Sequence, residues 1–489
     1  MKSKEIKDSD CFPLLSDFIN TINQLNTETG LHLLVKNETT MYFGFVGFGI
    51  GDTLALQWLG GFLEGVGKAF KFCRTCHITH DDRSDNLNNT FVLRDMKTHL
   101  IQLELLNESP DLSKQFGVKN KSVLCKLTDF DICTSLLHDP MHVLVEGVCI
   151  SELKYLLNYA TKEKKIDLCK INKRILGYEY FFIDKDDKPN AIGENHIVNG
   201  SFPLSAGQMI TLVLNLPFIL GDLFNTFDEH WLNFINLNQI LNLVFSFFYD
   251  TTTLYDLNYT IRDYLEKFHS LYPSASITPK MHYLTHLTAQ MENFGPLRQH
   301  ACFRCEAKNG LLKSLDFKNF KNICFSAAEK HQFWMASVEM KQVNKNSLKY
   351  TDDICKVDNK RVVSDKHFYF DDLKPKSFLS VSKYLKKNGF QYTPGSFLIL
   401  NFNLKVNRSE SIGMIKEILV VDGIYIFYVQ LHSIKKFHKN LNCFEISSEE
   451  NYIYVKFDDL YFKQVQFGKY FSDLLFLQVR YLHHLLSSE

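Results

Sequence analysis

The chain has 489 residues, of which 45% are hydrophobic, so it is long enough for two or three domains and a large core. Its 55 basic and 55 acidic side chains give a formal net charge of zero, which argues against a generally basic nucleic-acid binder and leaves only local patches for DNA contact. The sequence shows no apolar run of about 18 residues that would predict a membrane helix and no secretory signal, and its twelve scattered cysteines are typical of reduced thiols in the cytosol or nucleus.

The N-terminal part is predicted to combine helices with two short strands. Residues 10–29 carry apolar side chains at helical spacing. Residues 31–36 and 40–50 predict strands, and the second is apolar almost throughout, as buried strands are. That strand ends just before Asp52 and a predicted helix at 53–66. Asp52 would therefore lie at the C-terminal edge of a sheet, where mixed sheets place reactive groups, although it is equally suited to cap the helix.

The middle of the chain is predicted to be mainly helical. Residues 77–130 are polar and predict irregular structure, whereas the apolar spacing from 131 to 341 is mostly that of helices. The clearest helical stretches are 136–160, 204–224 and 230–250, with a turn-rich interruption at 181–200.

The C-terminal part changes to the period of strands. Apolar and polar residues alternate from 376 to 489 between turn signals, one of which is Pro394-Gly395. Five or six short strands in this length favour a small barrel or sandwich. Such domains bind partners through edges and loops, so docking of a protein partner is expected here by analogy.

Two pairs of side chains have the spacing of metal ligands. Cys73 and Cys76 form a CxxC pair, and His282 and His286 lie one helical turn apart, so both imidazoles can reach one ion. Two competing ligand sets are the second CxxC pair, Cys302 with Cys305, and the pair His77 with His80. The alternative to a metal site is a set of buried thiols and helix-surface histidines.

The order of these residues resembles a known group of enzymes. Asp52, the CxxC pair, the HxxxH pair and Glu306 follow one another as in the RNase H-like DDE transposases of the CACTA, Mirage, Chapaev and Transib group. The run HDPMHVLVEGV, with Asp139 and His142, and the run FGPLRQHACFRCEAKNGLLK also resemble stretches of these elements. Both runs have simpler interpretations, because Asp139 before Pro140 suits a helix N-cap and Glu306 suits a solvated helix surface.

The resemblance implies an α+β fold with a truncated RNase H-like core, a large all-α insertion and a small β-barrel-like C-terminal domain. The implied parts are the core remnant (1–76), the helical insertion (77–278), the helices with zinc ligands and last carboxylate (279–341), a linker (342–375) and the β-rich domain (376–489). It also implies structural zinc on Cys73, Cys76, His282 and His286.

Catalysis in this group needs three carboxylates that hold two Mg²⁺ ions. Asp52 and Glu306 would be the second and third, and the first should lie on a strand ahead of helix 10–29, where this sequence has none. We therefore expect at most one weak Mg²⁺ site.

These observations predict a transposase-derived nuclear protein that contacts DNA or chromatin but does not cut it. One alternative is an active DDE-type nuclease or transposase whose first carboxylate is lost through a truncated gene model. Another is a zinc-stabilised scaffold for protein interactions.

Overall fold

The computed structural model describes residues 12–35, 38–83, 91–314, 323–343, 353–354, 359–362, 378–387, 390–400, 412–421, 423–460, 463–471 and 474–480. The chain divides into two units. The first comprises Met1–Tyr180, Asp184–Leu220 and Asp228–Phe333, and the second comprises Phe181–Ile183, Gly221–Phe227 and Trp334–Glu489. We describe each unit by itself.

The first unit begins with a helix and an exposed hairpin. Helix α2 (Phe12–Leu25) is followed by strands β1 (Leu31–Val35) and β2 (Glu38–Tyr42), which pair antiparallel with each other. All of β2 is exposed, so the prediction of a buried strand at 40–50 is wrong. The remainder of that segment has no regular strand, but Gly49 forms an isolated parallel bridge with Leu136.

Helix α3 (Thr53–Leu59) is shorter than the helix predicted at 53–66. It ends at the cap residue Gly60. The next residue, Gly61, has a φ of +74°, and a Cβ there would lie 2.0 Å from the carbonyl oxygen of Asn120. The close approach of a neighbouring backbone therefore requires glycine at this position and stops the helix.

Residues 77–130 are more regular than the sequence predicts. Helices α4 (Met96–Glu108) and α5 (Leu112–Phe116) and the 3₁₀ turn η1 (Val123–Lys126) all lie within them. Asp95 caps α4 through the N–H of Thr98. Ile19 of α2 packs with apolar residues of this region in one core cluster, so α2 lies on these turns rather than on the hairpin.

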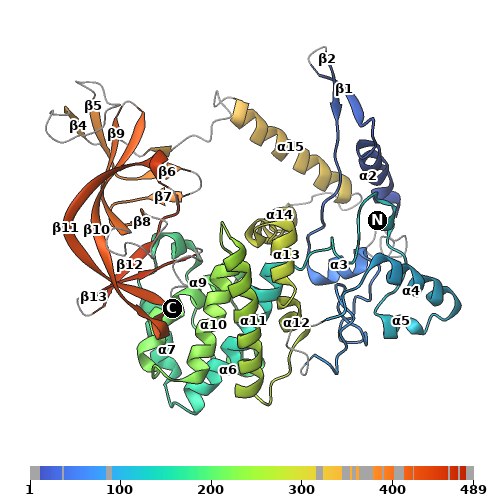
Figure 1. The fold of residues 1–489 in the computed structure, drawn as a ribbon, viewed down its shortest axis with the longest axis horizontal. Coiled ribbons are helices and arrows are strands. Elements are labelled where there is room, and N and C mark those ends of the chain that lie inside the picture. The colour runs from blue at the N-terminus through green and yellow to red at the C-terminus, as the bar shows by residue number, and fades with distance from the viewer. Residues whose placement is uncertain are drawn as a thin grey trace. The chain divides into compact units, whose positions relative to one another are not determined.

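Residues 131–343 are mainly helical, in line with the helical spacing of the sequence (Figure 1). The elements are η2 (Met141–Val148), α6 (Cys149–Lys162), α7 (Leu168–Gly177), η3 (Phe182–Asp187), α8 (Glu194–Asn199), α9 (Ala206–Leu220), η4 (Gly221–Leu223), α10 (Glu229–Val244), α11 (Thr251–Leu271), α12 (Pro279–Leu284), α13 (Leu287–Phe294), η5 (Leu297–Gln299), α14 (Phe303–Lys313) and α15 (Ile323–Val343). Carboxylate caps start several of them; Asp228 accepts from Trp231 N at α10, and Asp250 accepts from Thr253 N at α11.

Helix α9 forms part of the core of this unit, beside α10. Together with η4 it provides one stretch, Ala206–Leu223, that is long and apolar enough to cross a membrane, so the expectation that the chain has no such run is wrong; 67% of that stretch is buried inside the protein. The buried Asn215 of α9 donates a hydrogen bond to Asp184 (3.0 Å), and Asn238 of α10 donates one to Val213 O (2.7 Å). Core helices of globular proteins have this composition too.

The second unit is built on antiparallel strands. Its largest sheet has the order β12-β13-β11-β10-β9-β5-β4, and β8 also pairs with β9; a second sheet has the order β3-β6-β7. The strands are β3 (Asp353–Ile354), β4 (Asn359–Val362), β5 (Phe378–Ser382), β6 (Leu385–Lys387), β7 (Phe390–Tyr392), β8 (Phe397–Ile399), β9 (Ile412–Val421), β10 (Ile424–His438), β11 (Cys443–Lys456), β12 (Phe467–Phe471) and β13 (Leu474–Gln478).

One turn signal of the C-terminal part, Pro394-Gly395, coincides with a turn of the structure. Pro394 and Gly395 form a turn just before β8, and Gly395 has a φ of +88°. The range 342–375, predicted as a linker, instead carries β3 and β4, which pair with β6 and β5. Most of that range lies outside the described residues, including the segment 363–377 just before β5.

The protein is therefore a mixed α+β chain with an antiparallel sheet in its C-terminal part. Within the described residues of the N-terminal part, the regular sheet is limited to the β1–β2 hairpin, and the other strand-like pairings are isolated bridges such as the one between Gly49 and Leu136. The RNase H-like core stays a prediction.

Candidate metal centre

The two cysteines of the first CxxC pair lie in a tight turn between short bridges. Lys71 pairs with Thr79 on one side, and Cys76 pairs with Leu93 on the other. Inside the turn the backbone N–H of Thr75 points at the Sγ of Cys73 (3.4 Å). An N–H donor aimed at sulfur favours the thiolate, which is the form that binds metal.

The two histidines come from consecutive short helices rather than from one continuous helix, which corrects the sequence-based picture. His282 lies in α12, which Thr278 caps and Pro279 begins, and His286 is the first residue before α13. The intervening Thr285 keeps helical dihedral angles, and its hydroxyl donates to His282 O (2.7 Å). The rings therefore keep the i, i+4 proximity that the spacing predicts.

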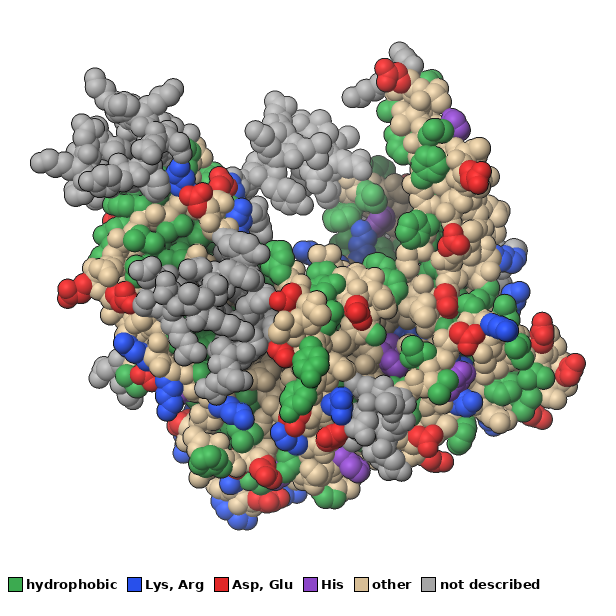
Figure 2. All heavy atoms as spheres, in the orientation of Figure 1, with side chains coloured by type: hydrophobic (Ala, Val, Ile, Leu, Met, Phe, Trp, Pro, Cys, Tyr) green, Lys and Arg blue, Asp and Glu red, His purple; other side chains and the backbone are tan. Residues whose placement is uncertain are grey.

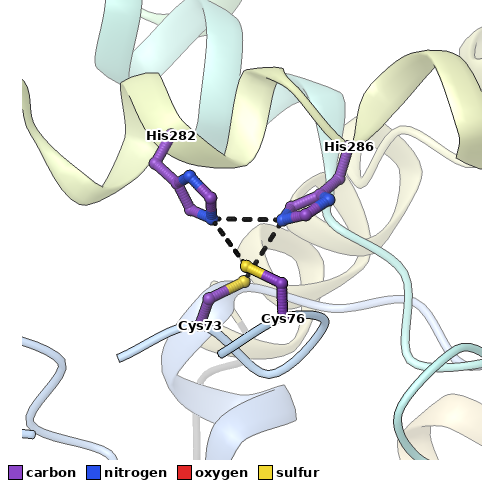
Figure 3. A group of neighbouring side chains, drawn as sticks. All are labelled: Cys73, Cys76, His282 and His286. Carbon is purple, nitrogen blue, oxygen red and sulfur yellow. Dashed lines mark hydrogen bonds between the residues drawn. The ribbon is translucent and has the colours of Figure 1, made fainter. Parts of the chain in front are cut away.

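All four side chains point at one another (Figure 3). Sγ of Cys76 lies 3.3 Å from Nε2 of His282, Sγ of Cys73 lies 3.4 Å from Nε2 of His286, and the two Nε2 atoms are 3.1 Å apart. All four ligand atoms lie within 4.8 Å of one another, and all four residues are buried. The group could hold a metal ion.

The electrostatics of the group favour a thiolate at Cys73 and a neutral ring at His282. Burial opposes ionisation of Cys73, but the hydrogen bond from Cys76 and the nearby His286 and His282 hold its pKa well below the usual range. Burial and the Cys73 thiolate raise the pKa of Cys76. Burial lowers the pKa of His282, so its ring stays neutral and can donate a lone pair.

A third segment, residues 136–138, connects the two halves of the group. The guanidinium of Arg74, inside the CxxC turn, donates to Leu136 O (2.9 Å) and Leu137 O (2.7 Å). Gln290 of α13 exchanges two hydrogen bonds with the backbone of His138 (2.8 and 2.9 Å). These bonds fix the cysteine turn and the histidine helices to the same short stretch of backbone.

Arg94 donates hydrogen bonds to the backbone of the cysteine turn and of neighbouring segments. Its Nε donates to Cys73 O (2.8 Å) and Cys76 O (3.2 Å), and its Nη2 donates to Phe116 O (2.7 Å) and Lys71 O (3.3 Å). Burial lowers the pKa of Arg94, whereas the nearby Cys73 raises it. Its positive charge next to the turn also favours a thiolate there.

Aromatic rings enclose the histidine side of the group. Phe72 and Phe91 meet the His282 ring edge-on at centroid distances of 5.4 and 4.8 Å, and the His138 ring stacks on Tyr283 at 4.5 Å. These rings and the burial of all four side chains shield the group from water. A site with four protein ligands and no open position is structural, whereas catalytic zinc sites keep one position for water.

The competing ligand sets do not join this group. Burial and the charge of Arg94 lower the pKa of His77 to about 4. His80 interacts through its two ring nitrogens with Val66 O and the guanidinium of Arg83. Cys302 belongs to a separate group with Asp139 and His142, which we discuss below.

The two carboxylates that the sequence suggested for catalysis lie in different surroundings. Asp52 caps α3, and its Oδ1 accepts from Ala55 N at 2.7 Å, as the simpler interpretation predicts. Glu306 is 46% exposed on α14, and its Oε1 lies 4.0 Å from Nε2 of His142. Among the described residues, neither carboxylate belongs to a group of three or more close metal-ligating side chains.

Sequence reasoning missed the residues that support the ligands. Arg74 and Arg94 gave no periodic signal, and their partners are carbonyl groups that any residue can provide. One signal was available for Arg74, because a charged residue between two ligand cysteines must either face solvent or find buried acceptors.

No family model matches this chain, and comparison with curated proteins finds no match either.

Proposed function

We propose that Cys73, Cys76, His282 and His286 bind one structural Zn²⁺ ion in a nuclear protein derived from DDE transposases. In this proposal the chain keeps DNA contacts without cutting DNA. The observation that carries it is the convergence of two thiols and two imidazoles in one buried group.

Zinc is the metal that this ligand set favours. Two thiolates and two imidazoles suit a tetrahedral ion, with Zn–S near ~2.3 Å and Zn–N near ~2.0 Å, which places neighbouring ligand atoms about 3.3–3.8 Å apart. The separations of 3.1, 3.3 and 3.4 Å lie within a few tenths of an ångström of that range. Mg²⁺ prefers oxygen ligands in octahedral geometry and does not suit sulfur.

The proposed transposase ancestry rests on the order of motifs along the chain. In the DDE transposase families that this chain resembles, the zinc ligands follow one catalytic carboxylate in the sequence and precede another. Here the ligands that come together follow Asp52 and precede Glu306. A shared order is an argument by analogy, and it supports ancestry more than activity.

The surroundings of the two carboxylates support the inactive form of this proposal. A two-metal clamp stabilises both the attacking and the leaving oxygen, and it needs carboxylates gathered around two ions. The carboxylate of Asp52 is engaged in capping α3. Glu306 lies beside the His142 ring, which also contacts Asp139 and Glu146, so the carboxylates near Glu306 do not include Asp52. Losing one metal removes many kcal/mol of transition-state stabilisation, and ~1.4 kcal/mol already costs tenfold in rate.

In this proposal, any contact with DNA is made by lysine and arginine side chains that are scattered over the surface. On the face drawn in Figure 2, acidic and basic side chains are interspersed among the coloured residues. Binding of that kind rests on phosphate contacts and weakens steeply with salt.

A second candidate function is a zinc-stabilised scaffold for protein interactions. The specific observation in its favour is the apolar surface on and next to the β1–β2 hairpin. Leu34 is 73% exposed, and Phe43 and Phe45 just after β2 are 60% and 68% exposed. Exposed apolar groups of this size are characteristic of interaction surfaces.

The test of the inactive assignment is a nicking assay on supercoiled DNA with the purified chain. We expect no nicking with Mg²⁺ or Mn²⁺, and DNA retention that is lost between low and moderate salt. Metal-dependent nicking that Glu306→Ala abolishes would make the chain an enzyme. DNA retention that is absent even at low salt would favour the scaffold.

A further inference from the structure

A second group of metal-ligating side chains lies outside the zinc centre. It consists of Asp139 and His142, at the start of η2, with Cys302 at the start of α14; one ligand atom from each lies within 4.8 Å of the others. Asp139 and Cys302 are buried, and the side chain of His142 is 17% exposed. More than 150 residues of chain separate the two halves of the group, so folding alone brings them together.

Hydrogen bonds already place these side chains without a metal. Oδ1 of Asp139 accepts from the backbone N–H groups of Cys302 (2.9 Å) and Met141 (3.2 Å). Oδ2 accepts from the His142 backbone N–H (3.1 Å) and interacts with Nδ1 of the same ring. Asp139 therefore joins the two helix starts at their N-terminal ends.

A fourth donor, Cys305, lies next to this group. The Cys302 thiol interacts with the carboxylate of Asp139 and with the thiol of Cys305, which belongs to the first turn of α14 and is exposed. Burial and the carboxylate of Asp139 raise the pKa of Cys302. The sulfur of Cys302 therefore lies beside the Asp139–His142 pair, and the thiol of Cys305 neighbours Cys302 just outside that group.

Further acidic groups surround the histidine on its other side. Nε2 of His142 lies 3.8 Å from Oε2 of Glu146 and 4.0 Å from Oε1 of Glu306. Lys280 lies on the same side and directs its Nζ to Glu146 O (2.8 Å). Three carboxylates and two thiols close to one lysine make a site that favours a divalent cation.

The backbone that carries His142 is irregular. Residues Met141–Val148 form a π-helix, and Glu146 has φ −91° and ψ 17° inside it. Such π segments are rare and frequently lie at functional sites. The π-helical geometry of η2 therefore supports a functional role for this helix, which also packs against α12.

We propose that Cys302, Cys305, Asp139 and His142 form a second Zn²⁺ site of this protein. Both thiols lose a proton to solvent when the ion binds, and the imidazole binds as the neutral ring. Sulfur donors select zinc over Mg²⁺ and Ca²⁺. The site is more open than the first centre, because Cys305 and the two glutamates are exposed, so it releases its metal more readily.

The second site has a structural consequence for α14. This helix buries none of its side chains. The bond from Cys302 N to Asp139 is therefore a large part of what fixes its N-terminal end. A metal at this position would fix the orientation of Glu306, which lies one turn into the helix.

The test counts zinc per chain by native mass spectrometry and elemental analysis, on the full chain kept reduced and supplied with Zn²⁺ alone. The wild type should hold two ions. The double variant Cys302→Ser/Cys305→Ser should hold one and keep its circular dichroism spectrum. The control variant Cys169→Ser removes an exposed cysteine from α7 and should hold two.

Two further readouts distinguish a built site from adventitious binding. With Co²⁺ in place of Zn²⁺, the wild type should show sulfur-to-cobalt absorption for four thiolates, and the double variant should show about half of it. A competing chelator should remove one ion well before the other. One zinc ion in the wild type, or two in the double variant, would overturn the proposal.

Discussion

Removing the ion from the first zinc centre should destabilise the whole first unit. The contact between Cys76 and His282 closes a loop of 206 residues. A cross-link across that length removes chain entropy worth about 5 kcal/mol from the unfolded state in the loop-closure model. That value is comparable with the total stability of a domain, about 5–15 kcal/mol.

Loss of the metal also destabilises the folded state directly, in addition to the loss of the cross-link. Cys73 and Cys76 are 1% and 0% exposed, and His282 and His286 are 3% and 7% exposed, so without metal they remain buried as polar groups with only one another as partners. At an unfolding entropy of about 2.1 cal/mol/K per residue, a unit of roughly 320 residues shifts its melting temperature by about 1.5 °C per kcal/mol, so the melting temperature should fall by about 8 °C or slightly more.

The assay is thermal unfolding followed by circular dichroism, with zinc-loaded protein, chelated protein and protein to which zinc has been returned. Cys76→Ser should lower the melting temperature as much as chelation does and should make the protein insensitive to chelator. The matched control is Cys149→Ser, which changes a cysteine that is 0% exposed in α6 and should keep the response to chelator. An unchanged melting temperature on chelation, with equal effects of the two variants, would refute the reasoning.

Two further predictions concern buried charged groups. Burial raises the pKa of Glu152, which accepts hydrogen bonds from Tyr264 and Tyr272, to about 8. The folded state therefore holds a proton that the unfolded state loses above pH 4.5, and stability should fall as pH rises from there to about 8 and level off above. Glu152→Gln should remove this pH dependence, which amounts to a change in the free energy of unfolding on the order of 5 kcal/mol, in urea titrations across pH; an unchanged pH dependence would contradict the assignment. Arg94→Met should lower the free energy of unfolding by about 3–5 kcal/mol and weaken zinc binding, because four backbone carbonyl groups lose their hydrogen-bond donor. The control variant Lys119→Met changes an exposed lysine and should lower the free energy of unfolding by under about 0.5 kcal/mol. Equal effects of the two variants in urea unfolding would count against a role for Arg94.

The convergence of the two pairs could be predicted because metal-binding chemistry restricts where such side chains can be placed. Two thiols separated by two residues, and two imidazoles one helical turn apart, each need further ligands to complete a site, and the chain offers few. The helical middle and the turn at Pro394-Gly395 were predictable for a similar reason, since periodicity and turn residues are local signals.

The N-terminal hairpin was not predictable from the same rules. The run at 40–50 is as apolar as a buried strand, but β2 and the residues that follow it are exposed. Hydrophobic content describes what a segment would gain by burial, and it does not say whether another element covers it. Helix α4 was missed because its buried face includes the polar His99 and Gln102, which weaken the apolar period.

The contacts that connect the site depend on long-range folding. Arg74 meets the backbone of Leu136 and Leu137, and Asp139 meets the backbone of Cys302, across 62, 63 and 163 residues. Backbone partners leave no residue-specific signal in a sequence. The second group of potential ligands was therefore visible only as two separate pairs, DxxH and CxxC.

The most direct test of the account is X-ray absorption at the zinc edge on the Cys302→Ser/Cys305→Ser variant, which isolates the first centre. We predict one zinc ion per chain with two sulfur ligands near ~2.3 Å and two nitrogen ligands near ~2.0 Å. A folded chain without zinc, or a zinc ion that has only oxygen and nitrogen neighbours, would contradict the central claim.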